Sequence, residues 1–503
     1  MGEHGLFGTG GYGVIGRSAG NGPPQIGGLS AQCDPLFTDF FYASDRPLYS
    51  PPPLPFTERG MSSMNQYGGH SLDIGSIGNG QQFRFSQNYH HLNHSCDSTV
   101  MSSNSRSDVE LAPTYPDTKL MPYDIFDANR NAYSLDVSAV YQMIERYAKD
   151  KLGCKYLQDN LPPAGPRRDA VFAVLMRQPD SFESLAFDVF ANFYAQKLVE
   201  SAKSADQVAW IRTSIVSKIP DICYNRYSCR VVQKSLEVLP ESDKLALLSK
   251  IMEHDVVTMA VDQNANHIVQ KIVEKFKPAE WKLMLNSVTS HDGSFFRIME
   301  SKYGCRVMQL TVDTLSKQLA NKITFCEVQT VLVPLMEKIF THCERLSSNE
   351  FANYVIQHTL QMPNLGDYRN RIIEQCLLRN LLSLSQEKFA SHVVEKALAY
   401  APPQLRFAML EELFDGYLPD VETGKDCLDV LLFHQYGNYV VQRMLTACID
   451  VLKGPRSAVS ASDLASYRKW TGRLTDQISE NVGHLSRYSS GKKIIQLLQD
   501  YVK

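Results

Sequence analysis

The hydrophobic pattern of this chain changes near residue 120. Beyond that point apolar residues recur at helical spacing, as in "VSAVYQMIERYAKD" from Val137 and "LALLSKIMEHDVV" from Leu245. Such spacing places the apolar side chains on one face of a helix and the polar ones on the other. The pattern predicts amphipathic helices throughout residues 118–503. The preceding stretch, residues 1–117, has no comparable periodicity.

A seven-residue phrase recurs along the helical part, as in "YGCRVMQ", "FANYVIQ" and "FASHVVE". We call the third to seventh letters of each phrase slots one to five. Slot one falls at Cys154, Asn192, Cys229, Asn266, Cys305, Asn353, Ser391 and Asn438, with separations of 38, 37, 37, 39, 48, 38 and 47 residues. Eight units with a period near 37 predict an all-α fold, an α-solenoid in which each repeat packs on its neighbours.

Slots one, two and five carry a distinctive chemistry. In a helix, slots one and five stack one turn apart with slot two beside them, while slots three and four point to the other side. Slots three and four are mostly Val, Ile, Leu or Met, which indicates core. Slot one is small and polar or a thiol, slot two is mostly planar or cationic, and slot five is an amide or a carboxylate. The triads are Cys154, Lys155, Gln158; Asn192, Phe193, Gln196; Cys229, Arg230, Gln233; Asn266, His267, Gln270; Cys305, Arg306, Gln309; Asn353, Tyr354, Gln357; Ser391, His392, Glu395; and Asn438, Tyr439, Gln442.

Two interpretations of these triads compete. In one, slots one and five join adjacent repeats by hydrogen bonds, but such joints would tolerate any polar residue and would not require a planar slot two. In the other, slots one and five contact a base edge while slot two stacks between bases, which is how helical-repeat proteins bind unpaired RNA. The regularity of the triads favours the second interpretation.

The phrases "YGCRVMQ", "NANHIVQ", "FANYVIQ", "FASHVVE" and "YGNYVVQ" resemble those of the Pumilio (PUF) family of RNA-binding proteins. The resemblance extends from about residue 120 to 503, with half-repeats around "MPYDIFDANRN" and "SSGKKIIQLLQDY". It implies a right-handed solenoid of eight three-helix repeats, with single-stranded RNA running antiparallel along the inner face. It further implies that Asn with Gln reads uracil, Cys or Ser with Gln reads adenine, and Ser with Glu reads guanine. The element expected from repeats eight to one is 5′-UGUAUAUA-3′.

Glu395 differs from the Gln found at slot five in the other repeats. On its pairing edge guanine offers two adjacent donors, N1–H and the N2 amino group, and a carboxylate accepts from both at once. An amide would set a donor against one of these donors. We therefore expect Glu395 to read guanine.

Three departures bear on the 3′ half of the element. Lys155 lacks a planar group, and Phe193 can stack but cannot hydrogen-bond. The interval of 48 residues between repeats five and six, which contains "CEVQTVLVPLMEKIFTHCERLSS", is longer than its neighbours and could alter the local curvature. The U-G-U-A half is the firmer expectation.

The first 117 residues are expected to be a disordered, low-complexity tail. Residues 1–115 contain 17 of the 29 Gly, and such composition cannot bury enough apolar surface to offset the entropy of ordering. "GTGGYG" from Gly8 matches a dinucleotide-binding pattern, but no strand precedes it, so the match is attributed to chance. His90, His91, His94 and Cys96 could in principle bind zinc, but no second cluster of ligands accompanies them, so we attribute them to a polar low-complexity tract. "SPPPLPF" favours an extended spacer, with an aromatic groove on another protein as the alternative.

Composition says more about the cellular compartment of the protein than about its binding partner. The eleven Cys are scattered, no C-x-x-C occurs, and no signal peptide or long apolar run is visible, so we expect no metal, no membrane span and a cytoplasmic location. The net charge of −3 conceals an acidic tail, with five Arg, no Lys and nine Asp or Glu before Tyr115, and a nearly neutral remainder. An RNA-binding surface must then concentrate positive charge locally.

The resemblance implies a regulator that binds messenger 3′ untranslated regions and recruits repressor proteins, commonly a deadenylase complex. No catalytic constellation or cofactor motif is visible, so we expect neither enzymatic activity nor a cofactor, and a monomer. The interval before repeat eight contains "LFDGYLPDVETGKDC", where Tyr417 and Leu418 are candidate contacts for partner proteins, and an inert loop is the alternative. Two other classes remain: a peptide-binding armadillo or HEAT scaffold, and a branch of the family that binds RNA with little sequence preference in ribosome assembly.

Overall fold

The computed structural model describes residues 122–126, 136–321, 324–455 and 459–502. All of them belong to one compact unit, residues 109–503. Every regular element among these described residues is helical, in agreement with the predicted all-α fold. The predicted tail, the start of the repeat domain at residue 118 and the motifs near Gly8 and His90 lie outside the described residues.

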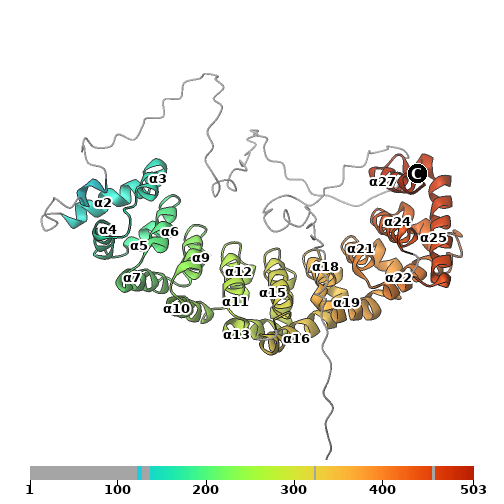
Figure 1. Cartoon of the computed structure of the whole chain (residues 1–503), viewed down its shortest axis with the longest axis horizontal. Helices are drawn as coiled ribbons and strands as arrows, with labels where there is room; N and C mark the ends of the chain where they lie inside the picture. Colours follow the sequence, from blue (N-terminus) through green and yellow to red (C-terminus); the bar gives the residue numbers. More distant parts are fainter. Residues whose placement is uncertain (1–121, 127–135, 322–323, 456–458, 503) are drawn as a thin grey trace, which may run out of the picture. The chain divides into compact units, whose positions relative to one another are not determined.

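Each repeat contributes a short helix, an inner helix and an outer helix in that order. Figure 1 shows the inner helices in one curved row on the concave side of this unit, and the outer helices in a second row on the convex side. The inner helices are α3 (Lys151–Asp159), α6 (Ala191–Ser201), α9 (Ser228–Val238), α12 (Asn266–Lys275), α15 (Gly304–Gln318), α18 (Asn353–Gln361), α21 (Ala390–Tyr400), α24 (Gly437–Lys453) and, in the C-terminal half-repeat, α27 (Ser489–Val502).

The outer row is built from longer helices on average. They are α4 (Pro166–Met176), α7 (Ala205–Val216), α10 (Glu241–Met252), α13 (Pro278–Thr289), α16 (Phe325–Thr341), α19 (Gly366–Ile372), α22 (Pro403–Asp415) and α25 (Ala461–Glu480). A π-helical turn, η4 (Ile373–Leu377), follows α19. A 3₁₀ turn, η3 (Pro363–Leu365), precedes α19, and another, η1 (Asp124–Phe126), opens the described part of the chain.

The first helices of the repeats are mostly short and lead into the inner row. They are α2 (Val137–Ala148), α5 (Ser181–Ala186), α8 (Asp221–Tyr224), α11 (Val256–Val261), α14 (Asp292–Met299), α17 (Cys343–Ser347), α20 (Leu381–Gln386), α23 (Cys427–Phe433) and α26 (Val482–Leu485). None of the helices in the described ranges is both long and apolar enough to cross a membrane.

The core runs without interruption between the two rows. Slots three and four supply much of it, as predicted: Val231, Val232, Val393 and Val394 are all fully or almost fully buried. Successive inner helices pack directly on one another, so each repeat covers the apolar face of its neighbour. This stacking places slots one, two and five of all eight repeats on the same row.

The long interval between repeats five and six is taken up mainly by helix. Helix α15 has 15 residues and α16 has 17, whereas the equivalent α9 and α10 have 11 and 12. Pro334 lies inside α16, where it removes one backbone donor from the helix. The extra residues therefore extend one inner and one outer helix instead of forming a separate domain.

Candidate nucleic-acid interface

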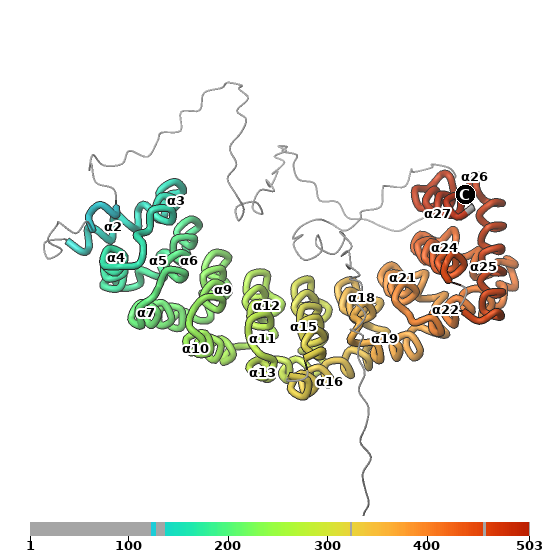
Figure 2. The backbone as a smooth tube through the Cα atoms, viewed as in Figure 1, coloured from blue at the N-terminus to red at the C-terminus, as the bar shows by residue number. Residues whose placement is uncertain are grey.

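The predicted triads all lie near the N-terminal ends of the inner helices. Figure 2 shows these helices following one another along a single edge of the unit. The slot-one side chains are buried, with no more than 7% of any of them exposed, and the slot-five side chains one turn later are half-buried. Slot-two side chains are half-buried or exposed. The arrangement presents one partly accessible polar group and one accessible side chain per repeat.

A polar residue four positions before slot one caps each inner helix in seven of the eight repeats. Its side chain accepts hydrogen bonds from the backbone N–H groups that open the helix, as Asp188 does from Phe190 and Ala191 at 2.8 Å each. The capping residues are Asp150, Asp188, Asn225, Asp262, Ser301, Asn349 and His434. Repeat seven has Glu387 at this position, and it accepts instead from Ser348 Oγ at 2.5 Å.

Sequence reasoning did not identify these caps. The signal was present, because a short polar residue at a fixed offset of four recurs with the same period as the triads. The cap fixes where each inner helix begins, and therefore where slot one lies. The capping residues therefore position the triads without belonging to them.

In the repeats with Asn at slot one, the Asn and Gln side chains are joined to each other. Gln Nε2 donates to Asn Oδ1 over 3.1 Å in repeat two, 2.7 Å in repeats four and six, and 3.4 Å in repeat eight. The Asn Nδ2 group donates back to the carbonyl oxygen four residues earlier, as from Asn353 to Asn349 at 2.7 Å. These bonds leave Gln Oε1 as an acceptor and the second Nε2 hydrogen as a donor.

Repeats one and three, which have Cys at slot one, hold their Gln differently. Gln158 Nε2 lies 3.2 Å from the carbonyl oxygen of Cys154 and 3.3 Å from its Sγ, and Gln233 Nε2 donates to the carbonyl oxygen of Cys229 at 3.1 Å. Burial raises the pKa of the Cys305 thiol to about 12, so it is neutral at physiological pH. In repeats one and three the Gln amide thus donates to the backbone carbonyl of slot one, and in repeat one also to its sulfur.

Repeat seven has neither arrangement. Ser391 Oγ donates to the carbonyl oxygen of Lys388 at 3.4 Å. Glu395 Oε1 lies 3.1 Å from His392 Nδ1, its slot-two neighbour. The carboxylate is half-buried and leaves acceptor positions facing outward.

These bonds bear on the two interpretations of slots one and five. If the slots joined adjacent repeats, their hydrogen bonds would cross from one inner helix to the next. The bonds made by the slot-five side chains instead run within one helix, to a residue three or four positions earlier. One slot-one side chain does join two repeats: Cys154 Sγ donates to the carbonyl oxygen of Phe190 at 3.0 Å.

The slot-two residues of adjacent repeats are close enough to influence one another. Burial, together with the nearby charges of Arg230 and Arg306, lowers the pKa of His267 to about 4. Arg230 and Arg306 belong to repeats three and five, which flank repeat four in the row, and His267 is neutral at pH 7. Two guanidinium groups in the repeats that flank a neutral ring give a cationic surface suited to stacking bases and attracting phosphates.

The first two repeats depart from this pattern at slot two. Lys155 forms an ion pair with Asp159 in its own helix, with Nζ and Oδ2 3.0 Å apart. The Phe193 ring is 46% exposed, unusually accessible for a large apolar side chain. An exposed ring at this position suits stacking, whereas Lys155 offers charge without a plane.

The loop before repeat eight, residues 416–426, separates its two candidate residues. The Tyr417 hydroxyl accepts from Leu382 N at 3.1 Å and donates to the Glu412 carboxylate, so it is tied to the body. Leu418 is 94% exposed. Within the loop, Asp420 Oδ1 accepts from Thr423 N at 2.7 Å and Gly424 adopts a positive φ of 68°. The loop is therefore internally ordered and presents Leu418 outward.

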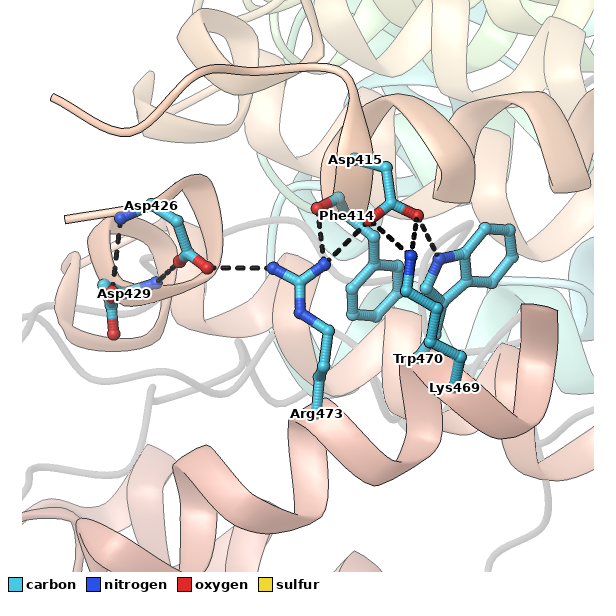
Figure 3. Close-up of polar contacts among 7 residues, drawn as sticks. All are labelled: Phe414, Asp415, Asp426, Asp429, Lys469, Trp470 and Arg473. Carbon is cyan, nitrogen blue, oxygen red and sulfur yellow. Dashed lines mark hydrogen bonds and ion pairs between the residues drawn. The ribbon is translucent and has the colours of Figure 1, made fainter. Parts of the chain in front are cut away.

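The two ends of this loop are held together by helix α25 (Figure 3). Arg473 donates to Asp415 Oδ1 just before the loop and to Asp426 Oδ2 at the last residue of the loop, each at 2.9 Å. Trp470 Nε1 donates to Asp415 Oδ2 at 2.8 Å. Burial alone would raise the pKa of Asp415, but the bonds from Trp470 and Lys469 and the Arg473 charge hold it below its ordinary value.

Comparison with known proteins gives consistent results. The family model described as "Pumilio-family RNA binding repeat" matches residues 218–252, 255–289, 294–322, 342–375, 380–414 and 433–453, which include repeats three to eight. Fem-3 mRNA-binding factor 2 of Caenorhabditis elegans is 35% identical over 431 residues, covering 82% of this chain and 67% of that protein. Pumilio domain-containing protein 7 of the same organism is 39% identical over 364 residues, covering 72% and 74%.

Comparison with solved structures gives the same result as comparison with sequence relatives. The crystal structure of PUF-6 in complex with 5BE13 RNA matches with a TM-score of 0.65 and 35% identity, covering 73% of this chain and all of that one. The structure of PUF-8 in complex with PBE-RNA matches with a TM-score of 0.58 at 23% identity, which supports the fold alone. The predicted solenoid fold is thereby confirmed for the repeat part of the chain.

Proposed function

The chain belongs to the Pumilio family of RNA-binding proteins, and we propose that it is a sequence-specific regulator that reads an element close to 5′-UGUAUAUA-3′ in messenger 3′ untranslated regions. The observation that supports this most is the set of eight polar triads carried in order by one row of helices. Each triad offers a defined pattern of donors and acceptors beside a side chain that can stack.

The uracil assignment is implied by the resemblance to the family, and the groups that the Asn–Gln pairs leave available are compatible with it. Uracil presents an N3–H donor between two carbonyl acceptors, so the Gln Oε1 and Nε2 groups can accept from N3 and donate to a carbonyl. Adenine can use the same amide through N1 and N6. We infer that slot one then selects by size, because Asn fills space that the shorter Cys leaves for a purine. Repeats two, four, six and eight would read uracil, and repeats one, three and five adenine.

Guanine is assigned to repeat seven. Glu395 is an acceptor-only group in the slot where the other repeats have an amide, and guanine is the base with two adjacent donors on its pairing edge. With repeat eight at the 5′ end, repeats eight to five read U-G-U-A. The 3′ half passes the lengthened α15 and α16 and ends at Lys155, so its base preference is expected to be looser.

Selection of RNAs from a random pool tests this function directly. Full-length protein should enrich sequences that share U-G-U-A followed by an A/U-rich half, because each good base contact discriminates by about 1–3 kcal/mol. A fragment of residues 118–503 should bind UGUAUAUA as tightly as the full chain, because the triads begin only at Cys154. Enrichment without a shared element would support the family branch that binds RNA with little sequence preference. A tenfold weaker fragment would place part of the interface in the tail.

We propose that the bound protein represses its messages in the cytoplasm by recruiting repressor proteins such as a deadenylase complex, as a monomer without catalytic activity of its own. The loop at residues 416–426 is the surface proposed for such a partner. The exposure of Leu418 and the ordering of the loop by Asp420 support it, because an ordered apolar contact loses little entropy on binding. Tyr417 would act mainly by holding the loop in place.

Replacing Leu418 by Asp should separate the two activities. RNA affinity should stay within about twofold of wild type, because Leu418 belongs to no triad and its side chain is almost fully exposed. Repression of a reporter whose 3′ untranslated region carries UGUAUAUA should fall sharply, since a charge would disfavour an apolar contact. Leu283→Asp is the matched control, because Leu283 is 77% exposed on the outer helix α13. Equal repression by the two variants would argue for an inert loop.

A further inference from the structure

The C-terminal half-repeat contains an inner helix with the geometry of a full repeat. A Cβ atom added to Gly491 at the start of α27 would lie 2.2 Å from the carbonyl oxygen of Leu485, six residues earlier. A Cβ atom added to Gly304 would likewise lie 2.3 Å from the carbonyl oxygen of Ile298, and one added to Gly153 would lie 2.4 Å from that of Tyr147. In repeats five and one this glycine directly precedes slot one. The same close approach therefore fixes the register of α27.

This register identifies the slots of the half-repeat. Counted from Gly491, slots one, two and five are Lys492, Lys493 and Gln496, and slot three is Ile494, which is fully buried like the slot-three residues elsewhere. Helix α27 packs on α24 as α24 packs on α21, and it continues the inner row in Figure 2. A ninth set of slots thus follows that of repeat eight.

The chemistry of this ninth set differs from that of the triads. Lys492 and Lys493 are exposed, and within the part of the chain that the structure describes neither forms an ion pair. Gln496 Nε2 donates to Asp500 Oδ1 at 2.8 Å, one turn further along α27, so its amide is directed away from slot one. The set therefore offers two ammonium groups and no amide positioned as in a triad. Ammonium groups are donors and point charges without an acceptor, which suits phosphate oxygens.

We propose that α27 forms a ninth position on the RNA-binding row, where Lys492 and Lys493 bind the phosphates of the nucleotides immediately 5′ of the eight-base element. This proposal rests on the proposed function, which places the 5′ uracil at repeat eight. Nucleotides that precede it would continue along the row onto α27. Binding through phosphates adds affinity whatever the flanking bases are, and it weakens with salt because counterions are released on binding.

The test compares three RNAs by fluorescence anisotropy with the full-length chain: UGUAUAUA, the same octamer with three added 5′ nucleotides, and the octamer with three added 3′ nucleotides. The 5′ extension should tighten binding by about threefold or more at low salt, and AAA, CCC and UUU extensions should do so equally. Methylphosphonate linkages in the 5′ extension, which are uncharged, should abolish the gain.

The variant Lys492→Gln/Lys493→Gln should bind the octamer and its 3′-extended form as wild type does, but gain nothing from the 5′ extension. Its logarithmic salt slope on the 5′-extended RNA should be shallower by about 1.4, or about 0.7 for each phosphate that a lysine no longer neutralises. The matched control, Lys250→Gln/Lys282→Gln, removes two positive charges from the outer helices α10 and α13 and should keep the full gain.

Several results would overturn the proposal. They are a 5′ gain retained by the α27 variant, a gain that disappears equally in the control variant, no gain in wild type, or a gain confined to one flanking base. Failure of wild type to prefer UGUAUAUA over a scrambled octamer would instead overturn the proposed function, and this inference with it. Thermal melts of both variants should match wild type, because the substituted lysines lie on the surface.

Discussion

A protein carrying both Ser391→Asn and Glu395→Gln should prefer UUUAUAUA over UGUAUAUA, reversing the order of the wild type. The two substitutions recreate the Asn–Gln pair of repeats six and eight, where Gln Nε2 donates to Asn Oδ1 and leaves an acceptor and a donor available. Glu395→Gln alone should weaken binding to UGUAUAUA by about 1–3 kcal/mol, the usual range for a bidentate base contact. Much of that loss comes from a guanine donor left facing an amide donor.

Measuring both affinities beside a thermal melt separates base reading from a structural role. Glu387→Gln is the matched control, because Glu387 accepts from Ser348 Oγ of the neighbouring repeat and has no place in a triad. This control should lower the melting temperature slightly and leave the preference for guanine intact. A stably folded double variant that shows no switch toward uracil would refute the assignment of repeat seven.

Replacing Tyr354 by Ala should weaken RNA binding by about 1–3 kcal/mol without changing which bases are preferred. Tyr354 occupies slot two of repeat six, and its ring is half-buried close enough to Cys305 of repeat five for the two groups to affect each other electrostatically. Under the proposed function the ring would supply a stacking surface between bases and no base-edge contact. The loss should be similar whichever base occupies the flanking positions.

Two further variants make this prediction specific. Tyr354→Phe keeps the ring and should retain most of the affinity. Tyr400→Ala removes an exposed ring from the far end of α21 and should not affect binding. Altered base preference with unchanged affinity in Tyr354→Ala would show that slot two reads bases instead of stacking on them.

The triads were predictable from the sequence because they repeat: a single Asn–Gln pair means little, but eight sets with one spacing define a row. Their internal bonding was not predictable. Whether Gln donates to an Asn side chain, as Gln270 does, or to the helix backbone, as Gln233 does, depends on side-chain geometry. The caps were missed because Asp, Asn, Ser and His alternate at that position, so they look unrelated until their common role is seen.

The different environments of two neighbouring residues in the loop could not be predicted from the sequence either. Tyr417 and Leu418 are adjacent apolar candidates in the sequence, yet one is bonded to Glu412 and Leu382 while the other is almost fully exposed. One partner of the Tyr417 hydroxyl, Glu412, is only five residues away at the end of α22, but the other, Leu382, belongs to α20 and lies 35 residues earlier, which the local sequence does not indicate. The long interval before repeat six likewise gave no sign that it would extend α15 and α16.

The bonds between Arg473 and both ends of the loop have a practical consequence for deletion mapping. Arg473 lies in α25, after the last complete triad, so a fragment that stops soon after repeat eight would keep all eight triads and the loop itself. It would lack the residue that joins Asp415 to Asp426, and its loop ends would be free to separate. A partner that failed to bind such a fragment would seem to require the C-terminal helices as its docking site. Substituting Arg473 in the intact chain, with Leu418 left in place, distinguishes a missing docking site from a loop that has opened.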